Sequence, residues 1–182
     1  MLYQSEVLEE NAVLQTAARM CAAARTAPKA HGKDTIRTLV LTAEDKEALA
    51  RKMEEVGLRE MGDKMNTWYG RDAANVRKAG AVVLIGAEQV KRAVPHCGFC
   101  GFRDCTECSA AGGNCAFSYV DLGIAVSSAV SAAAADRIDN RIMYSIGKTA
   151  AEMHYMENVI WLGIPISVSG KSIFYDRGIF HD

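Results

Sequence analysis

The chain has 182 residues, 49% of them hydrophobic, with 21 Lys and Arg against 22 Asp and Glu. We expect a single domain over residues 1–182 that buries its core without disulfide staples, and the balanced charge, with no basic stretch among aromatic residues, argues against nucleic-acid binding. The longest apolar stretch, 122–135, is shorter than the roughly 20 residues of a membrane span, and the N-terminus lacks a secretory signal, so we expect a cytoplasmic protein.

The first half of the chain predicts two helices and two strands in alternation. Residues 5–27 form the first helix, and 36–41 the first strand. The motif Thr42-x-x-Asp45 resembles a capping box that opens an amphipathic, methionine-rich helix reaching residue 65. Residues 80–86 are apolar throughout, which is typical of a strand covered on both faces. The predicted apolar face of the first helix contains Val7, Leu8, Leu14, Ala17, Ala18, Cys21 and Ala24.

The second half continues the alternation of helices and strands. Ser118-x-x-Asp121 is a second capping-box candidate, for a helix that ends near Asp136. Residues 140–146 and 159–164 are predicted strands, with a short helix near 147–157 between them. This order predicts an α/β or α+β fold, in which helices cover a central sheet.

Five of the six cysteines fall within one short run, so the loop over 95–116 is the candidate metal-binding region. The sixth, Cys21, lies on the predicted apolar face of the first helix, where a buried structural thiol is expected. Thiolates crowd together when something bonds to them, and the candidates are an iron–sulfur cluster, a zinc ion or disulfides. The spacing is C-x2-C-x4-C-x2-C-x6-C, formed by Cys97, Cys100, Cys105, Cys108 and Cys115.

Disulfides are the weakest of these candidates, because they predominate in small secreted domains that cannot bury a core. Zinc sites usually combine two C-x2-C pairs that are a dozen or more residues apart. Here only the short segment between Cys100 and Cys105 separates the two pairs, which is tight for one ion. His96 is a further candidate zinc ligand.

An iron–sulfur cluster fits the run better. Cys100-x4-Cys105-x2-Cys108 has the spacing of plant-type ferredoxins, but Cys115 follows sooner than their remote fourth ligand. We therefore prefer [4Fe–4S], with [2Fe–2S] and zinc as alternatives, and the choice of four ligands stays open. Glycines allow the loop to fold round a cluster, and nearby basic residues can offset its negative charge. The glycines are Gly98, Gly101, Gly112 and Gly113, and the basic residues are Lys91, Arg92 and Arg103.

No acid–base or nucleophilic constellation accompanies the cysteine run. The four histidines are scattered along the chain, at His31, His96, His154 and His181. Lys171, Asp176 and Arg177, in the glycine-punctuated tail, are candidates for a small-molecule site.

Several segments resemble known families. Residues 24–33, Ala-Arg-Thr-Ala-Pro-Lys-Ala-His-Gly-Lys, and the helix opening Asp121-Leu-Gly-Ile-Ala-Val resemble nitroreductase-like flavoproteins. The Cys-Gly-Phe-Cys-Gly-Phe run, together with 139–147 and 163–177, resembles a prokaryotic family described as uncharacterised proteins containing a ferredoxin domain. The resemblance implies a nitroreductase-like central sheet flanked by helices, with an inserted cysteine-rich, ferredoxin-like loop. It brings no established reaction.

The start of the first helix departs from the nitroreductase pattern. Nitroreductases usually hold the flavin phosphate with a basic cluster there, whereas this chain has Glu6-Val-Leu-Glu-Glu10. Since a phosphate needs cations or oriented N–H groups, we predict no tightly bound FMN. The candidate substitutes for the missing cations are Arg19, Arg25, Lys29 and Lys33.

These observations predict an iron–sulfur electron-transfer protein that serves a redox partner protein or a small-molecule carrier. The alternatives are a flavin-dependent oxidoreductase fed by the cluster and a non-enzymatic, zinc-stabilised module. Residues 123–135 contain no side chain larger than isoleucine, which allows close helix packing. Because the equivalent helix of nitroreductase-like proteins lies at a two-fold interface, we predict a homo-oligomer, either a dimer or a trimer of dimers.

Overall fold

The computed structural model describes residues 1–175, apart from the side chains of Met65 and Thr67. Its sheet consists of β1 (Ile36–Leu41), β2 (Ala81–Glu88), β3 (Asp139–Asn140) and β4 (Val159–Ser167). The spatial order is β1-β2-β4-β3, and every neighbouring pair is antiparallel. The short β3 pairs only with the C-terminal end of β4, so β2 and β4 form the centre of the sheet.

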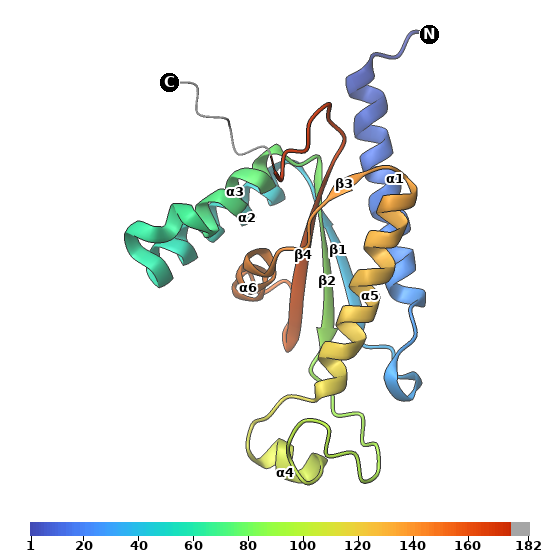
Figure 1. The fold of residues 1–182 in the computed structure, drawn as a ribbon, viewed down its shortest axis with the longest axis vertical. Coiled ribbons are helices and arrows are strands. Elements are labelled where there is room, and N and C mark those ends of the chain that lie inside the picture. Colours follow the sequence, from blue (N-terminus) through green and yellow to red (C-terminus); the bar gives the residue numbers. More distant parts are fainter. Residues whose placement is uncertain (176–182) are drawn as a thin grey trace.

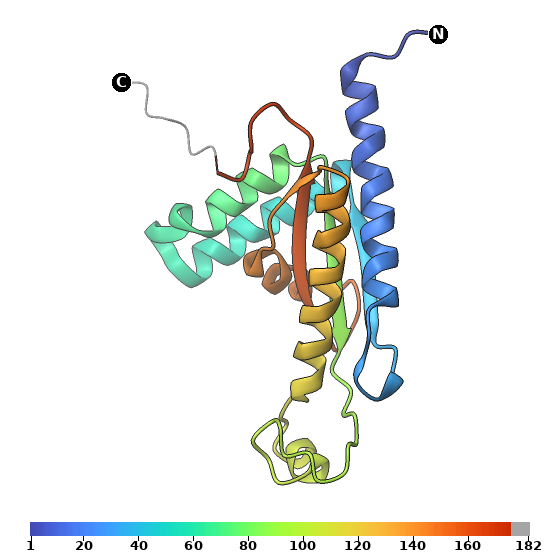
Figure 2. The same ribbon diagram turned by 45° about the vertical axis from the view of Figure 1, so that its right-hand side comes forward.

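Helices cover both faces of this sheet (Figures 1 and 2). One layer contains α1 (Ser5–Thr26) and α5 (Ala116–Ala135), which lie side by side. The opposite layer contains α2 (Ala43–Met61), α3 (Tyr69–Lys78) and α6 (Tyr144–Glu152). The fold therefore has three layers, as the sequence predicts. The remaining helical elements are the short η1 (Ala30–Gly32), η2 (Gly62–Thr67) and α4 (Cys105–Ala110).

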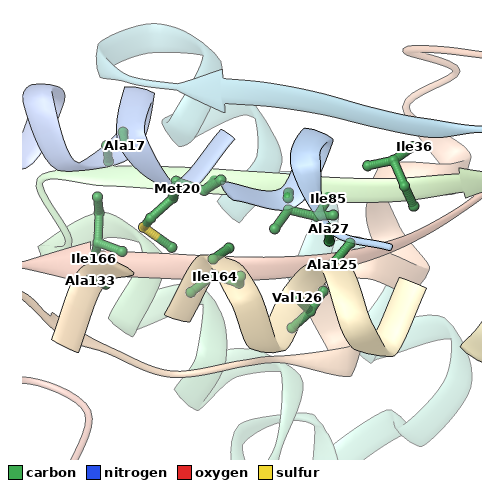
Figure 3. Close-up of a cluster of buried hydrophobic side chains, with 14 of the residues drawn as sticks. Ala17, Met20, Ala27, Ile36, Ile85, Ala125, Val126, Ala133, Ile164 and Ile166 are labelled. Carbon is green, nitrogen blue, oxygen red and sulfur yellow. The ribbon is translucent and has the colours of Figure 1, made fainter. Parts of the chain in front are cut away.

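The two core clusters follow from the alternation of side chains along β2. Val83 and Ile85 point into the cluster under α1 and α5, whereas Val82 and Leu84 join the cluster under α2, α3 and α6. Figure 3 shows the first cluster, in which Met20 of α1 lies between the two helices and the sheet. Burial on both faces explains why β2 is apolar throughout, although its neighbours are antiparallel.

The predicted strand at 140–146 is wrong. Only Asp139–Asn140 form a strand, Met143 makes an isolated bridge to Gly163, and α6 begins at Tyr144. The apolar residues in this segment suit a strand locally, but α6 packs tightly across β4 through Gly147. The helix predicted beyond residue 61 is also interrupted, since Gly62 has a φ of +53° and η2 leads into the unpredicted α3. The other predicted elements are confirmed within a few residues.

In neither predicted capping box does the side chain make the expected capping hydrogen bond. Thr42 is the N-cap of α2, as predicted, but its hydroxyl makes no capping bond. The helix predicted from Ser118 instead starts at Ala116, so Ser118 and Asp121 lie inside α5. There they face the protein interior and bind other segments.

The apolar face of α1 agrees only in part with the prediction. Ala17 and Ala24 are buried as expected. Val7, Leu8 and Leu14 are exposed, whereas the helix buries Val13 and Met20 against the sheet. Cys21 is half-buried, and burial raises the pKa of its thiol while a hydrogen bond with Thr38 lowers it. The outer part of α1 thus carries apolar side chains that contact solvent.

Among the described residues, α5 alone is long and apolar enough to cross a membrane, with 20 residues and a mean hydropathy of 1.4. The apolar stretch identified in the sequence, 122–135, is therefore shorter than the apolar helix in the structure, Ala116–Ala135. By composition, a core helix passes the same test, and α5 packs one side against α1 and β2.

Candidate metal centre

The five clustered cysteines lie in the connection between β2 and α5, at one end of the molecule (Figure 1). Cys105 begins the short helix α4, where Asp104 caps the N-terminus by accepting a hydrogen bond from the Glu107 N–H at 2.9 Å. Cys108 lies on the same helix, and Cys115 is the N-cap residue of α5. The loop therefore places two thiols on one helical turn and a third at the start of the longest apolar helix.

Four of the five clustered cysteines line one cavity. The lining includes Cys97, Cys100, Cys105 and Cys115, together with Arg92 and the aromatic rings of Phe99, Phe102 and Phe117. All these cysteines are free thiols. Among the described residues, no group of three or more His, Cys, Asp or Glu side chains converges closely enough to hold a single metal ion. The cavity lining nevertheless contains four residues with soft sulfur donors, of the kind that iron–sulfur clusters use.

Cys108 lies beside this cavity. Its side chain is buried, and its Sγ lies 3.7 Å from the carbonyl oxygen of Asn114. Burial, a hydrogen bond with Cys100 and repulsion from that group raise the pKa of the Cys108 thiol. A proton therefore stays on this sulfur more readily than on an ordinary cysteine.

Glycines shape the loop, as the sequence predicts. Gly98, Gly101 and Gly112 have positive φ angles, which other residues adopt at a cost. Gly113 has a different role, because a Cβ there would lie 2.6 Å from the Phe102 ring and 3.0 Å from Cys108 Sγ. Because Gly113 has no side chain, the backbone that leaves the loop can pass close to both Phe102 and Cys108.

Three side-chain contacts join the segment that enters the cysteine loop, 88–92, to the segment that leaves it, 113–121. We call this region the neck. Ser118 Oγ donates to the Glu88 carbonyl at 3.1 Å, and Lys91 Nζ donates to the Gly113 carbonyl at 2.8 Å. The third contact is an ion pair in which Arg92 Nη2 lies 2.7 Å from Asp121 Oδ2. The neck therefore fixes the start of the loop against the first turns of α5.

The Arg92–Asp121 pair is almost completely enclosed, with both side chains 1% exposed. The Arg92 guanidinium also donates to the Val90 carbonyl at 2.6 Å and to Thr35 Oγ1 at 2.7 Å. The second Asp121 oxygen accepts the Ala30 N–H at 2.9 Å. These bonds satisfy two buried charges, and removing one partner of such a pair costs about 3–5 kcal/mol.

The other residues singled out from the sequence lie apart from the thiols or are bound elsewhere. His96 is exposed and absent from the cavity lining, and Arg103 is an exposed residue paired with Asp104 at 3.1 Å. Lys171 lies in the segment after β4, and its carbonyl accepts a bond from Ser169. Asp176 and Arg177 lie outside the described residues.

Three of the four candidate phosphate-binding cations already have protein partners. Arg19 pairs with Asp136 and Arg25 with Asp34, each at 2.6 Å. Lys29 Nζ donates to the carbonyls of Arg25 and Ala27. These charges link α1 to the end of α5 and to the segment after α1, and the prediction about FMN remains a prediction.

The neck is the part of the site that the sequence did not predict. Arg92 appeared only as one of several nearby positive charges, and Ser118 and Asp121 were assigned to a helix cap. The sequence signal was weak because the partners are 22 to 30 positions apart. An acidic residue within an otherwise apolar helix is the one local hint, since such a group needs a buried partner.

Comparisons with known proteins place this geometry in context. The model of a family described as "uncharacterized protein containing a ferredoxin domain (DUF2148)" matches residues 111–177, which include Cys115 but not the other four clustered cysteines. A protein of Archaeoglobus fulgidus, described as uncharacterized, is 40% identical over 97% of this chain and 98% of its own length.

Several solved structures with a similar fold are described as nitroreductases. An FMN-bound nitroreductase from Bacteroides fragilis has a TM-score of 0.60 at 10% identity, over 85% of this chain and 76% of its own. Another, from Desulfitobacterium hafniense, also has FMN bound and has a TM-score of 0.56 at 16% identity, over 94% and 81% of the two chains. These likenesses confirm the predicted nitroreductase-like sheet and its helical layers.

Proposed function

Because the chain belongs to the family of uncharacterized proteins containing a ferredoxin domain, we propose that it is an iron–sulfur electron-transfer protein with a [4Fe–4S] cluster in its cysteine loop. The observation that carries this proposal is the cavity lined by four thiols, within a loop that has a fifth. A cluster bound there supplies one-electron transfer, with a potential set by the hydrogen bonds, charges and burial around its sulfurs.

We assign the ligand role to the four cysteines that line the cavity, Cys97, Cys100, Cys105 and Cys115. Cys108 is left outside this set, because it is buried beside the cavity and does not line it. Lys91 and Arg92 hold the loop through the neck, and Phe99, Phe102 and Phe117 add apolar residues to the cavity lining.

The proposed partner is a redox protein or a small electron carrier that approaches the end of the molecule where the loop projects (Figure 1). Phe99 is 62% exposed there and lies against the Phe117 ring, with 5.5 Å between ring centroids. This places an apolar contact point next to the proposed cluster ligands.

Anaerobic purification followed by metal and sulfide analysis tests the proposal. We expect a brown protein with about four iron and four acid-labile sulfide ions per chain, and visible absorption that bleaches on reduction. Stoichiometric zinc without sulfide would contradict the proposal and support the zinc-stabilised module instead. A content of about two iron ions per chain would be consistent with electron transfer but would replace the proposed [4Fe–4S] cluster by [2Fe–2S].

Single Cys→Ser variants test the ligand assignment. Cys97→Ser, Cys100→Ser, Cys105→Ser and Cys115→Ser should each lose most of the iron, because a serine oxygen is a poor substitute for a soft thiolate. Cys108→Ser should retain it, and Cys21→Ser, on α1, is the matched control outside the loop. Iron loss in Cys108→Ser combined with retention in Cys115→Ser would move the fourth ligand to Cys108.

The second candidate function is a flavin-dependent oxidoreductase fed by the cluster, favoured by the FMN bound in two structures of similar fold. A groove of about 470 Å³ between α5, α6 and β4 offers it a site, lined by Tyr119, Tyr144, Lys148 and Trp161 among others. Denaturation of the purified protein should release no stoichiometric FMN. Release of one FMN per chain would promote this candidate over simple electron transfer.

A further inference from the structure

We propose that Arg92 and Asp121 form a clasp that positions the cysteine loop and sets the electrostatic environment of the group it holds. This inference rests on the proposed function for its second part only. Arg92 precedes the first clustered cysteine, and Asp121 follows the last one, at a sequence separation of 29 residues. A single buried ion pair therefore closes the loop at its base.

The clasp is held from three sides of the fold. Arg92 binds Asp121 on α5 and Thr35 next to β1, and Asp121 in turn accepts the Ala30 N–H of η1. The backbone of Arg92 is also fixed, because its carbonyl lies 3.0 Å from His31 Nδ1. Contacts with α5, with η1 and with the residue before β1 thus fix the position at which the loop begins.

The clasp also adjoins the cavity. Arg92 lines the same cavity as the four proposed ligands, and it is the largest fully buried side chain in the described chain. In this dry setting a charge acts strongly on its surroundings, since little water screens it. Asp121 neutralises Arg92, so the cavity adjoins a balanced pair and not a bare cation. Arg92 is therefore a positioning residue, and its net electrostatic effect depends on Asp121.

The reduction potential of the loaded protein tests this balance. In Asp121→Asn the uncompensated guanidinium should favour the more negative, reduced form, which raises the potential. In Arg92→Met the bare carboxylate should lower it. The neutral double variant Arg92→Met/Asp121→Leu should return close to wild type. Arg37→Met, which breaks a 2.7 Å ion pair to Glu88 outside the cavity lining, is the matched control. Shifts of equal sign in both single variants, or shifts no larger than the control's, would overturn the proposal.

Hydrogen exchange on metal-free protein tests the clasp independently of any cluster. Amides over 93–115 should exchange faster in the Arg92 and Asp121 variants than in wild type, whereas those of α2 and α3 should not change. If a single variant fails to fold, the double variant, which has no buried charge, decides the question. Unchanged exchange over 93–115 in the double variant would overturn the clasp. Wild-type protein without iron or sulfide would refute the proposed function but leave this exchange test valid.

Discussion

Gly147 lies where α6 crosses β4, and a Cβ at this position would collide with the Trp161 carbonyl oxygen. A backbone atom cannot swing away as a side chain can, so the helix itself must shift. We therefore expect Gly147→Ala to destabilise the protein by about 1–3 kcal/mol, despite the higher helix propensity of alanine. Urea unfolding measures this change in the free energy of unfolding.

Gly170→Ala is the matched control, because nothing lies within 4 Å of a Cβ built there. It should change stability little. Equal effects of the two substitutions would mean that α6 and β4 are not in close contact. Gly147 also explains why the predicted strand at 140–146 was wrong. The apolar residues of this segment suit a strand until the close crossing of α6 over β4 is known.

Single residues also show the limits of sequence analysis at the site. The thiol spacing alone located the candidate centre, because clustered cysteines have few other causes. The capping-box pattern at Ser118 and Asp121 was misassigned, because the same residue types serve a cap or a buried contact equally well. Only the position of Arg92 in space distinguishes these roles.

Among the elements, α2 and α3 are joined at the surface by ion pairs. Arg77 on α3 contacts Glu54 at 2.5 and 2.9 Å, and also binds Glu47. The Arg77 hydrogen bond lowers the pKa of Glu54 below its usual value of 4.5. Because the folded pKa is the lower one, this stabilisation is present above about pH 4.5 and is lost as pH falls through the folded value.

Glu54→Gln should therefore lower stability at pH 7 by about 0.5 kcal/mol or less, since both side chains are partly exposed to water. The difference from wild type should be smaller at pH 3, because the wild-type carboxyl takes up a proton as pH falls through its folded pKa. Glu9→Gln, at an exposed site on α1, is the matched control. Urea midpoints at the two pH values measure the effect. A constant difference at both values would attribute it to packing.

The helix α5 was predicted from the capping-box pattern at Ser118, and its small side chains predicted close packing, but the face that it buries was not predicted. Ala129 and Ala133 are fully buried in the cluster under α1, so they cannot form an interface with another copy. Periodicity could not decide this, because small residues occur all round the helix. The side left exposed contains Val120, Ile124, Ser127 and Ser131.

At the scale of the whole molecule, the predicted homo-oligomer should use this exposed side of α5. Light scattering should give a mass at least twice that of the 19.7 kDa chain. Ile124 is 39% exposed, and Ile124→Glu should shift the protein towards the monomer by placing charges against each other at a two-fold contact. Leu58→Glu, at a 62% exposed site on α2, should not. A wild-type mass of 19.7 kDa would exclude the oligomer.

The overall layering could be predicted because hydrophobic patterns report burial directly. The apolar run at 80–86 indicated a strand with two covered faces, and β2 has them. Strand order could not be predicted in the same way, since β1, β2 and β4 are similarly apolar and β3 has only two residues. Pairing depends on contacts between distant segments, which one sequence does not display.

The separation of the cysteine loop from the core has a consequence for how the protein matures. None of the five clustered cysteines belongs to either core cluster, and the neck closes through side chains that need no metal. Under the proposed function, we expect the chain to complete its fold first and to receive iron and sulfide afterwards. Damage by oxygen would then remove the proposed cluster from the loop and leave the rest of the fold intact. A new cluster could be assembled in the same molecule, which would regain its function.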